Sequence, residues 1–272
     1  MSAAPVIVSY PTWAEYRAAL AEIPTDVSVG GGDVSWAASK NVGDALQIAD
    51  KGWPEGMDRV RSIALPAVSS AVMAHVADDA WRYDVTGADY DVGEYVSGAP
   101  ECWLDRSAEA SRPVISIGAN IVSSGGIPAK VLEMRGAAVC ALTLALQAAG
   151  YVVRVYAVEG MSIGRDIWHR VEVTDPEGGP MDTDRLLYAL AHPSAARQLG
   201  YALGAHLVGR NGTNCGIGWP GSGPGQLPPA EWKFDLYLAG SYLDSANWND
   251  AASVNAWIAK TYQALTEGRS IN

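Results

Sequence analysis

The chain has 272 residues, of which 49% are hydrophobic, enough to bury a sizeable core, so we expect a globular protein. Its 30 acidic and 19 basic residues give a formal net charge of -11, which argues against nucleic-acid binding because phosphate recognition needs clustered positive charge. The three cysteines, Cys102, Cys140 and Cys215, lack C-x-x-C spacing, and no secretory signal opens the chain. We therefore expect neither a disulfide framework nor a zinc site, and a cytoplasmic location.

The first part of the chain alternates capping residues with apolar residues at helical spacing. Val6 to Ser9 has the pattern of a short strand, and Thr12 is placed to cap a helix that follows it. Asn41, with Asp44 three residues later, predicts a second helix that closes at Lys51-Gly52. Pro54 suits the first position of a third.

An acidic passage, Tyr83 to Glu94, has the composition of a calcium loop. Its glycine comes one place too early and no bidentate glutamate stands at the twelfth position, so calcium binding is not indicated. A hairpin that turns near Thr86-Gly87, followed by a short helix capped by Asp91 with Glu94 at its third position, accounts for the same carboxylates.

From Pro113 onward the pattern becomes strand, helix, strand. The expected elements are a strand at Val114 to Ile117, a helix at 129–149 and a strand at 151–158. Their order predicts a βαβ unit with parallel strands. The uncharged stretch 136–153 is interrupted by Gly150, where a helix would stop, so no transmembrane segment is expected.

The remainder of the chain continues with a strand at 168–173 and a helix at 182–203 that is kinked by Pro193. Residues 209–229 are rich in glycine and proline and predict a long loop. A last helix is indicated between a cap at Asp250 and a stop at Gly268.

Gly160 to Gly164 matches G-x-S-x-G and follows a strand, as the nucleophile elbow of a serine hydrolase does. Such an elbow must also launch a helix, whereas 168–173 alternates like a strand, so a hairpin loop is the favoured interpretation. A hydrolase that uses Ser162 stays open as the alternative. Its base and orienting carboxylate would come from His192, His206, Asp175 and Asp184.

A second match, Gly216 to Gly221, fits G-x-G-x-x-G but lies in the glycine- and proline-rich stretch without a flanking strand or helix, so no dinucleotide cofactor is expected. Trp219, within this match, is a candidate exposed contact residue, and burial against the core is the competing interpretation. The four histidines show no metal-ligand spacing.

The stretch Ile117 to Gly126 lies between a strand and a helix, at the carboxyl edge of the expected sheet, where α/β folds place their sites. The order of elements over 114–203 resembles the von Willebrand factor A fold, and the chain more closely resembles an uncharacterised family of bacteriophage proteins. Five patches carry that second resemblance: Gly52 to Gly56, Tyr83 to Ala88, Gly98 to Trp103, Arg135 to Ala138 and Ala189 to Ser194.

The von Willebrand A fold holds a divalent cation with the motif D-x-S-x-S in this loop. Here Asn120 stands at the aspartate position, Val122 at the first serine position and Ser124 at the second. One charge and one oxygen ligand are thereby lost, so Asn120 and Ser124 are poor candidates for a metal site. Hydrogen bonds within the turn, or capping of the next helix, are the expected role of both.

We therefore expect an α/β protein with a Rossmann-like, von Willebrand A-like, mostly parallel sheet, helices on both faces, a helical N-terminal region and a C-terminal helix. The expected division is 1–110, a helical and hairpin region on the core; 111–208, the core; 209–229, the loop; and 230–272, a C-terminal helical appendage.

The resemblance implies a non-catalytic phage adaptor in the host cytoplasm that binds protein, without cofactor, nucleic acid or membrane. An AAA+ ATPase is one conceivable partner, because phage proteins of the von Willebrand A type can accompany one. A virion or scaffold component is a further alternative.

Overall fold

The computed structural model describes most of the chain. The described residues are 4–29, 33–56, 58, 82–84, 89–105, 113–122, 127–162, 165–175, 182–210, 219–220, 227–240, 247–248 and 250–268.

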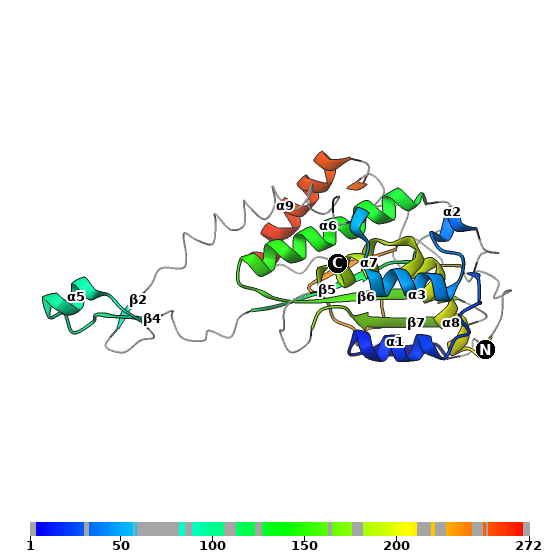
Figure 1. Ribbon diagram of the computed structural model, residues 1–272, viewed down its shortest axis with the longest axis horizontal. Helices are drawn as coiled ribbons and strands as arrows, with labels where there is room; N and C mark the ends of the chain where they lie inside the picture. Colours follow the sequence, from blue (N-terminus) through cyan, green and yellow to red (C-terminus); the bar gives the residue numbers. More distant parts are fainter. Residues whose placement is uncertain are drawn as a thin grey trace.

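One mixed, mostly parallel sheet organises the fold (Figure 1). Its strand order is β1 (Val6–Tyr10), β7 (Asp166–Glu172), β6 (Val152–Ser162), β5 (Val114–Asn120), β9 (Leu236–Leu238), and β8 (Trp219–Pro220) pairs with the end of β6. The β1–β7, β5–β6 and β5–β9 pairs are parallel, and β6 is antiparallel to both β7 and β8. The α/β class expected from the sequence is thus confirmed.

The centre of the sheet contains the expected βαβ unit. β5 and β6 are parallel and are joined by α6 (Ala129–Ala148). α6 is long and apolar enough to span a membrane by composition, but 67% of its most apolar window is buried inside the fold, as in a core helix. β6 then turns into β7 with Ser162 opposite Asp166, which confirms the expected hairpin.

The helices of the N-terminal region begin at side-chain caps that the sequence indicated. The Thr12 hydroxyl accepts a hydrogen bond from the Glu15 amide at the start of α1 (Trp13–Ala21). Asn41 does the same for Asp44 at the start of α3 (Val42–Lys51), which ends at Gly52 with φ of 82°. A short helix between them, α2 (Val34–Ala37), was not expected.

The expected kink at Pro193 is a complete change of helix type. α7 (Thr183–Ala191) ends at His192, a π-helix η2 (Ala195–Gly200) follows, and α8 (Tyr201–Leu207) resumes the α conformation. Near the C-terminus, α9 (Ala251–Thr266) starts at Asp250, whose carboxylate accepts from the Ser253 amide, and the chain turns at Gly268 with φ of 74°. Both ends of α9 agree with the sequence.

The two faces of the sheet are covered differently. Buried residues of α1, α3, α6, α7, α8 and α9 form one large core with Ile117 of β5, Val155 of β6 and Val171 of β7. The opposite face carries a smaller aromatic cluster, in which Trp232 and Phe234 of the segment 227–240 cover Tyr156, Val158 and Trp168. Among the residues that the structure describes, helices therefore cover one face, where the sequence analysis expected them on both.

A second, small sheet consists of β2 (Arg82–Asp84), β4 (Trp103–Asp105) and β3 (Asp89–Tyr90), in that order. Figure 1 shows it with α5 (Val92–Ser97) at the far left, apart from the main sheet. The expected hairpin is wrong in its pairing, because β2 and β3 each pair with β4. The expected cap is confirmed, since Asp91 accepts from the Gly93 and Glu94 amides. Thr86 and Gly87 lie outside the described residues.

Candidate functional site

The carboxyl edge of the sheet, where the sequence analysis placed a degenerate metal loop, is occupied by an arginine. Arg135 of α6 donates to the carbonyl oxygens of Asn120 at 2.8 Å, Leu238 at 2.9 Å and Ala239 at 2.7 Å. The residue is only 9% exposed. Carbonyl oxygens at the ends of β5 and β9 are thus bound by a cation that the chain itself supplies.

The side chain of Asn120 closes the turn beside this arginine. Its amide oxygen accepts a hydrogen bond from the Val122 amide at 3.0 Å. A divalent cation would have to displace a neutral ligand already in use and sit beside a guanidinium, so these residues do not fit one. Ser124, the second candidate, lies outside the described residues. In the described ranges, no three His, Cys, Asp or Glu side chains gather as metal ligands.

Ser162 lies in a strand rather than at a nucleophile elbow. It is the last residue of β6 and pairs with Asp166 of β7 and Trp219 of β8. An elbow would place the serine on a turn that leads into a helix. The geometry around Ser162 therefore lacks the strand-to-helix turn that the alternative hydrolase needs. The side chain of Trp219, the candidate contact residue, is not among those that the structure describes.

The histidine proposed as a base for Ser162 has other partners. The Nδ1 atom of His192 lies 2.8 Å from the Ser194 hydroxyl, which lies 2.9 Å from the Tyr188 hydroxyl, and Tyr188 donates to the Ala45 carbonyl. The Ser194 amide also donates to Nδ1 at 3.2 Å, so Nδ1 is an acceptor and the proton of the neutral ring lies on Nε2. Burial lowers the pKa of His192 to about 4. This series of hydrogen bonds joins the end of α7 to α3 and has a structural role.

The other residues considered for the hydrolase are dispersed. His206 lies 3.3 Å from Glu22, and Asp184 packs against Gly52 at the end of α3. These contacts lie in α7, α8 and the ends of α1 and α3, whereas Ser162 ends β6.

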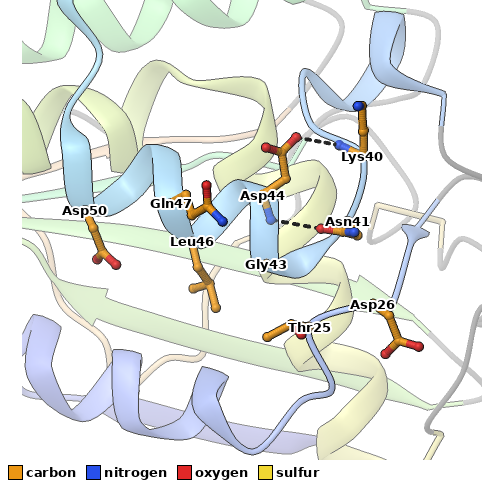
Figure 2. Close-up of a pocket in the computed structure, with 9 residues that line it drawn as sticks. All are labelled: Thr25, Asp26, Lys40, Asn41, Gly43, Asp44, Leu46, Gln47 and Asp50. Atoms are coloured by element: carbon orange, nitrogen blue, oxygen red, sulfur yellow. Dashed lines mark hydrogen bonds between the residues drawn. The ribbon is translucent and has the colours of Figure 1, made fainter.

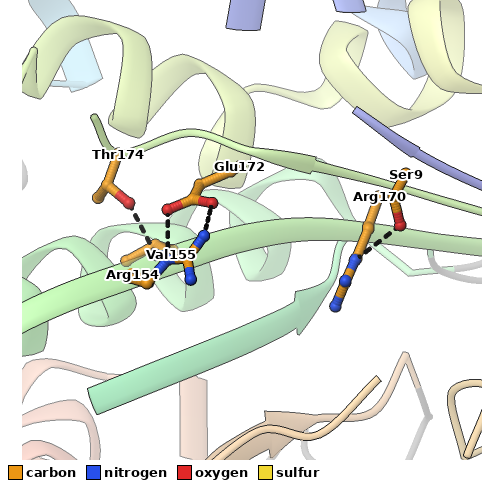
Figure 3. Close-up of polar contacts among 6 residues, drawn as sticks. All are labelled: Ser9, Arg154, Val155, Arg170, Glu172 and Thr174. Carbon is orange, nitrogen blue, oxygen red and sulfur yellow. Dashed lines mark hydrogen bonds and ion pairs between the residues drawn. The ribbon is translucent and has the colours of Figure 1, made fainter. Parts of the chain in front are cut away.

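The face of the sheet opposite the helices carries two arginines that sequence reasoning missed (Figure 3). Arg154 makes a two-pronged ion pair with Glu172 across the β6–β7 hairpin, with Nε to Oε1 at 2.8 Å. Arg170 donates to the Ser9 hydroxyl at 3.0 Å and lies 4.7 Å from the centre of the Trp232 ring. These contacts bind the edge strand β1 and the aromatic segment to the sheet. Alternation along the strands could have placed both arginines on one face, but not their partners.

A polar groove of about 610 Å³ runs along α3, from its N-cap Asn41 to Asp50 in its last turn (Figure 2). Its lining residues are Thr25, Asp26, Lys40, Asn41, Gly43, Asp44, Leu46, Gln47 and Asp50. Asp44 accepts from the Lys40 amide, and Asp50 pairs with Arg17 at 2.9 Å. Because Asp44, Asn41 and Asp50 are already engaged within the chain, the groove has the character of an ordinary polar helix surface.

The small sheet and α5 present apolar side chains to solvent. Val92 is 63% exposed, Tyr95 62% and Val96 78%. Tyr95 and Val96 come three and four positions after Val92, a spacing that places all three side chains on one side of the helix. Between positions 83 and 105 the chain has six acidic residues and no Lys, Arg or His. The stretch between Arg82 and Arg106 therefore combines an exposed apolar helix face with a net negative charge.

No curated protein and no solved structure matches the chain. A family model described as Domain of unknown function (DUF7192) matches residues 4–265, which is nearly the whole sequence. The chain therefore belongs to the DUF7192 family.

Proposed function

We propose that the protein is a non-catalytic adaptor that binds another protein through α5 and the adjoining β4. The carrying observation is the exposed apolar face formed by Val92, Tyr95 and Val96, next to Trp103, which is 37% exposed. Apolar side chains gathered at one place on a surface mark interaction sites, whereas scattered single ones are ordinary. The other large apolar residues that are exposed in the described chain stand far apart in sequence: Ile7, Val34, Val114 and Leu227.

The local structure of α5 suits it to dock as a preformed element. Asp91 caps its first turn, and Gly98, with φ of 80°, ends it by returning its amide to the Glu94 and Tyr95 carbonyls. A short helix held at both ends loses little conformational entropy when it binds. Its apolar face fits the groove-binding mode, in which side chains at positions i, i+3 and i+4 anchor the helix.

Charge then indicates the character of the partner surface. The six acidic residues between 83 and 105 outnumber the two arginines, Arg82 and Arg106, that flank them. A complementary surface carries Lys or Arg around an apolar groove, and the attraction accelerates association at low salt. The proposed partner is therefore a protein with a basic rim around an apolar pocket.

We infer a degenerate von Willebrand A-like core in which Arg135 provides the positive charge that a metal ion provides in the intact motif. A phage origin and a host-cytoplasmic location follow from the family resemblance, with an AAA+ ATPase as one candidate partner. Mass spectrometry of purified particles separates this role from that of a virion or scaffold component, which would be found in the particle.

The test compares two substitutions of exposed apolar residues by aspartate. Val96→Asp puts a charge on the α5 face, and Leu227→Asp puts one at another site that is 70% exposed. Each variant carries a photo-crosslinking residue in place of Val92 and is used to capture proteins from infected cells. We expect one partner to be crosslinked by the parent and by Leu227→Asp, and to be lost with Val96→Asp.

Circular dichroism and thermal melting of both variants confirm that the fold is retained. Capture should weaken as ionic strength rises, since exposed charges are screened within about 10 Å at 0.1 M salt. Equal capture by the two variants, or no specific crosslink across infection stages, would contradict the proposal.

A further inference from the structure

A glutamate and a histidine face each other inside the main core. Glu159 of β6 and His169 of β7 are partners in register and point to the helix-covered side of the sheet. They are 2% and 1% exposed, and Glu159 Oε2 lies 3.7 Å from His169 Nε2. Neither of these two atoms has a hydrogen-bond partner in the part of the chain that the structure describes. Buried polar atoms are almost always paired, so this arrangement requires an explanation.

The π-helix η2 covers the Glu159 carboxyl group on the helix-covered side of the sheet. A Cβ atom added to Gly200 would lie 1.6 Å from Glu159 Oε2, so the absence of a side chain at Gly200 is what lets the backbone pack on the carboxyl group. The small cavity beside Glu159 is lined by Trp13, Tyr16 and Leu199, among others, and its free volume of about 10 Å³ has room for at most one water molecule. Solvent is therefore largely excluded from the pair.

The groups packed around the site supply no positive charge to it. The titratable side chains that face Glu159 are Tyr16 of α1, Tyr10 of β1 and Tyr201 of α8, and the pKa of each is raised mainly by burial and further by Glu159. Burial alone raises the pKa of Glu159 well above its ordinary value of 4.5. An ionised carboxylate at this position would be a buried charge without compensation.

The imidazole is arranged as an acceptor toward Glu159. A hydrogen bond with the Gly200 backbone raises the pKa of His169, which identifies the ring N–H as the donor and the Gly200 carbonyl as the acceptor. Because Nε2 has no other partner, that donor is Nδ1, and Nε2 presents its lone pair to the carboxyl group. Burial outweighs the bond and lowers the pKa of His169 to about 4, so the ring is neutral at pH 7.

We propose that Glu159 and His169 form a buried proton-binding site, in which the folded protein holds one proton on the Glu159 carboxyl group opposite His169 Nε2, beneath η2. The unfolded chain at neutral pH has an ionised glutamate and a neutral histidine. Folding at pH 7 therefore takes up one proton from solvent at this site. A rise in pH that ionises Glu159 leaves a buried negative charge next to Gly200. Water can reach this charge when η2 moves away from the sheet.

The direction of the pH dependence follows from proton counts in the two states. From pH 4.5 up to the raised pKa of Glu159, the folded state holds one proton more than the unfolded state at this residue. The contribution of Glu159 to the stability of the fold therefore falls as pH rises. Over this range the unfolding constant increases about tenfold per pH unit. Glu159→Gln keeps the shape and cannot ionise, so it isolates this dependence.

The experiment measures urea unfolding of the parent protein, Glu159→Gln and Glu15→Gln between pH 5 and 9. Glu15 is an exposed glutamate on α1 and serves as the matched control. We expect the ratio of the unfolding constants of parent and Glu159→Gln to rise about tenfold per pH unit, and that of parent and Glu15→Gln to stay flat. A flat ratio for Glu159→Gln contradicts the proposal.

Infrared spectroscopy of the parent protein provides a second readout that does not depend on a variant folding. At pH 8 exposed carboxyl groups are ionised, so a remaining un-ionised carboxyl band supports the buried proton on Glu159, and its absence overturns the proposal. Hydrogen exchange of residues 195–200, compared between parent and Glu159→Gln at each pH, tests the closure. Faster exchange in the parent at high pH is expected, and equal exchange at every pH contradicts the role of η2.

Discussion

Replacing Arg135 by methionine tests whether the carboxyl edge of the sheet depends on the buried guanidinium. Three carbonyl oxygens, those of Asn120, Leu238 and Ala239, would lose their charged donor. A hydrogen bond to a charged group contributes about 1.5–3 kcal/mol, so the three together are of the order of 6 kcal/mol. The variant no longer has to desolvate a guanidinium, which offsets several kcal/mol of that loss.

We expect a net loss of about 3 kcal/mol in the free energy of unfolding, or about 150-fold in the unfolding constant. Lys130→Met is the matched control, because Lys130 is an exposed cation in the first turn of the same helix. That control should change the stability by less than about 0.5 kcal/mol. Urea titration followed by circular dichroism measures both, and indistinguishable midpoints for the two variants would refute the reasoning.

Gly200→Ala should destabilise the protein by about 1–3 kcal/mol through overpacking on Glu159. The double variant with Glu159→Ala should recover that loss, because the side chain that the new methyl group meets is removed. Additive losses of the two substitutions in thermal melts would contradict close packing of Gly200 on Glu159. A fluorophosphonate probe should leave Ser162 unlabelled in folded protein, and mass-spectrometric detection of the adduct would reopen the hydrolase alternative. The pKa of His192 is lowered to about 4, so the unfolded chain takes up its proton first and His192 costs stability as pH falls from 6.5 to 4. His192→Asn should remove about a tenfold change in the unfolding constant per pH unit over that range in urea titrations, and an unchanged slope would count against the buried neutral ring. Added Mg²⁺ should leave the melting temperature unchanged, and a rise that Asn120→Ala abolishes would show that the loop binds the ion.

Local chemistry in the sequence was sufficient to locate many helices and strands. Helix starts at Thr12, Asn41, Asp91 and Asp250 were correct, because the capping residue and the amide that it accepts lie within three residues of each other. The βαβ unit and the β6–β7 hairpin followed from contiguous periodic segments. Signals of this kind need no information from distant parts of the chain.

Pairing between distant segments was not visible in the sequence. β9 has three residues, Leu236–Leu238, too few to show alternation, and it becomes a strand because β5 offers an unpaired edge. β2 and β3 look like a hairpin locally, yet each binds β4 instead. The division of the chain into 1–110, 111–208, 209–229 and 230–272 stays a prediction, while the main sheet takes strands from both outer regions.

The residues of the site show the same limit most clearly. Asn120 could be placed at a strand end from the sequence, but Arg135 is fifteen positions away and Leu238 more than a hundred, so only the fold reveals that one binds the others. In the sequence, Glu159 and His169 are two polar residues of neighbouring strands. Only in the fold do α1, η2 and α8 bury them. Sequence determined which segments are helical or extended, because those preferences are local. Tertiary structure decided which polar groups lose water and meet, because burial depends on contacts between segments far apart in the chain.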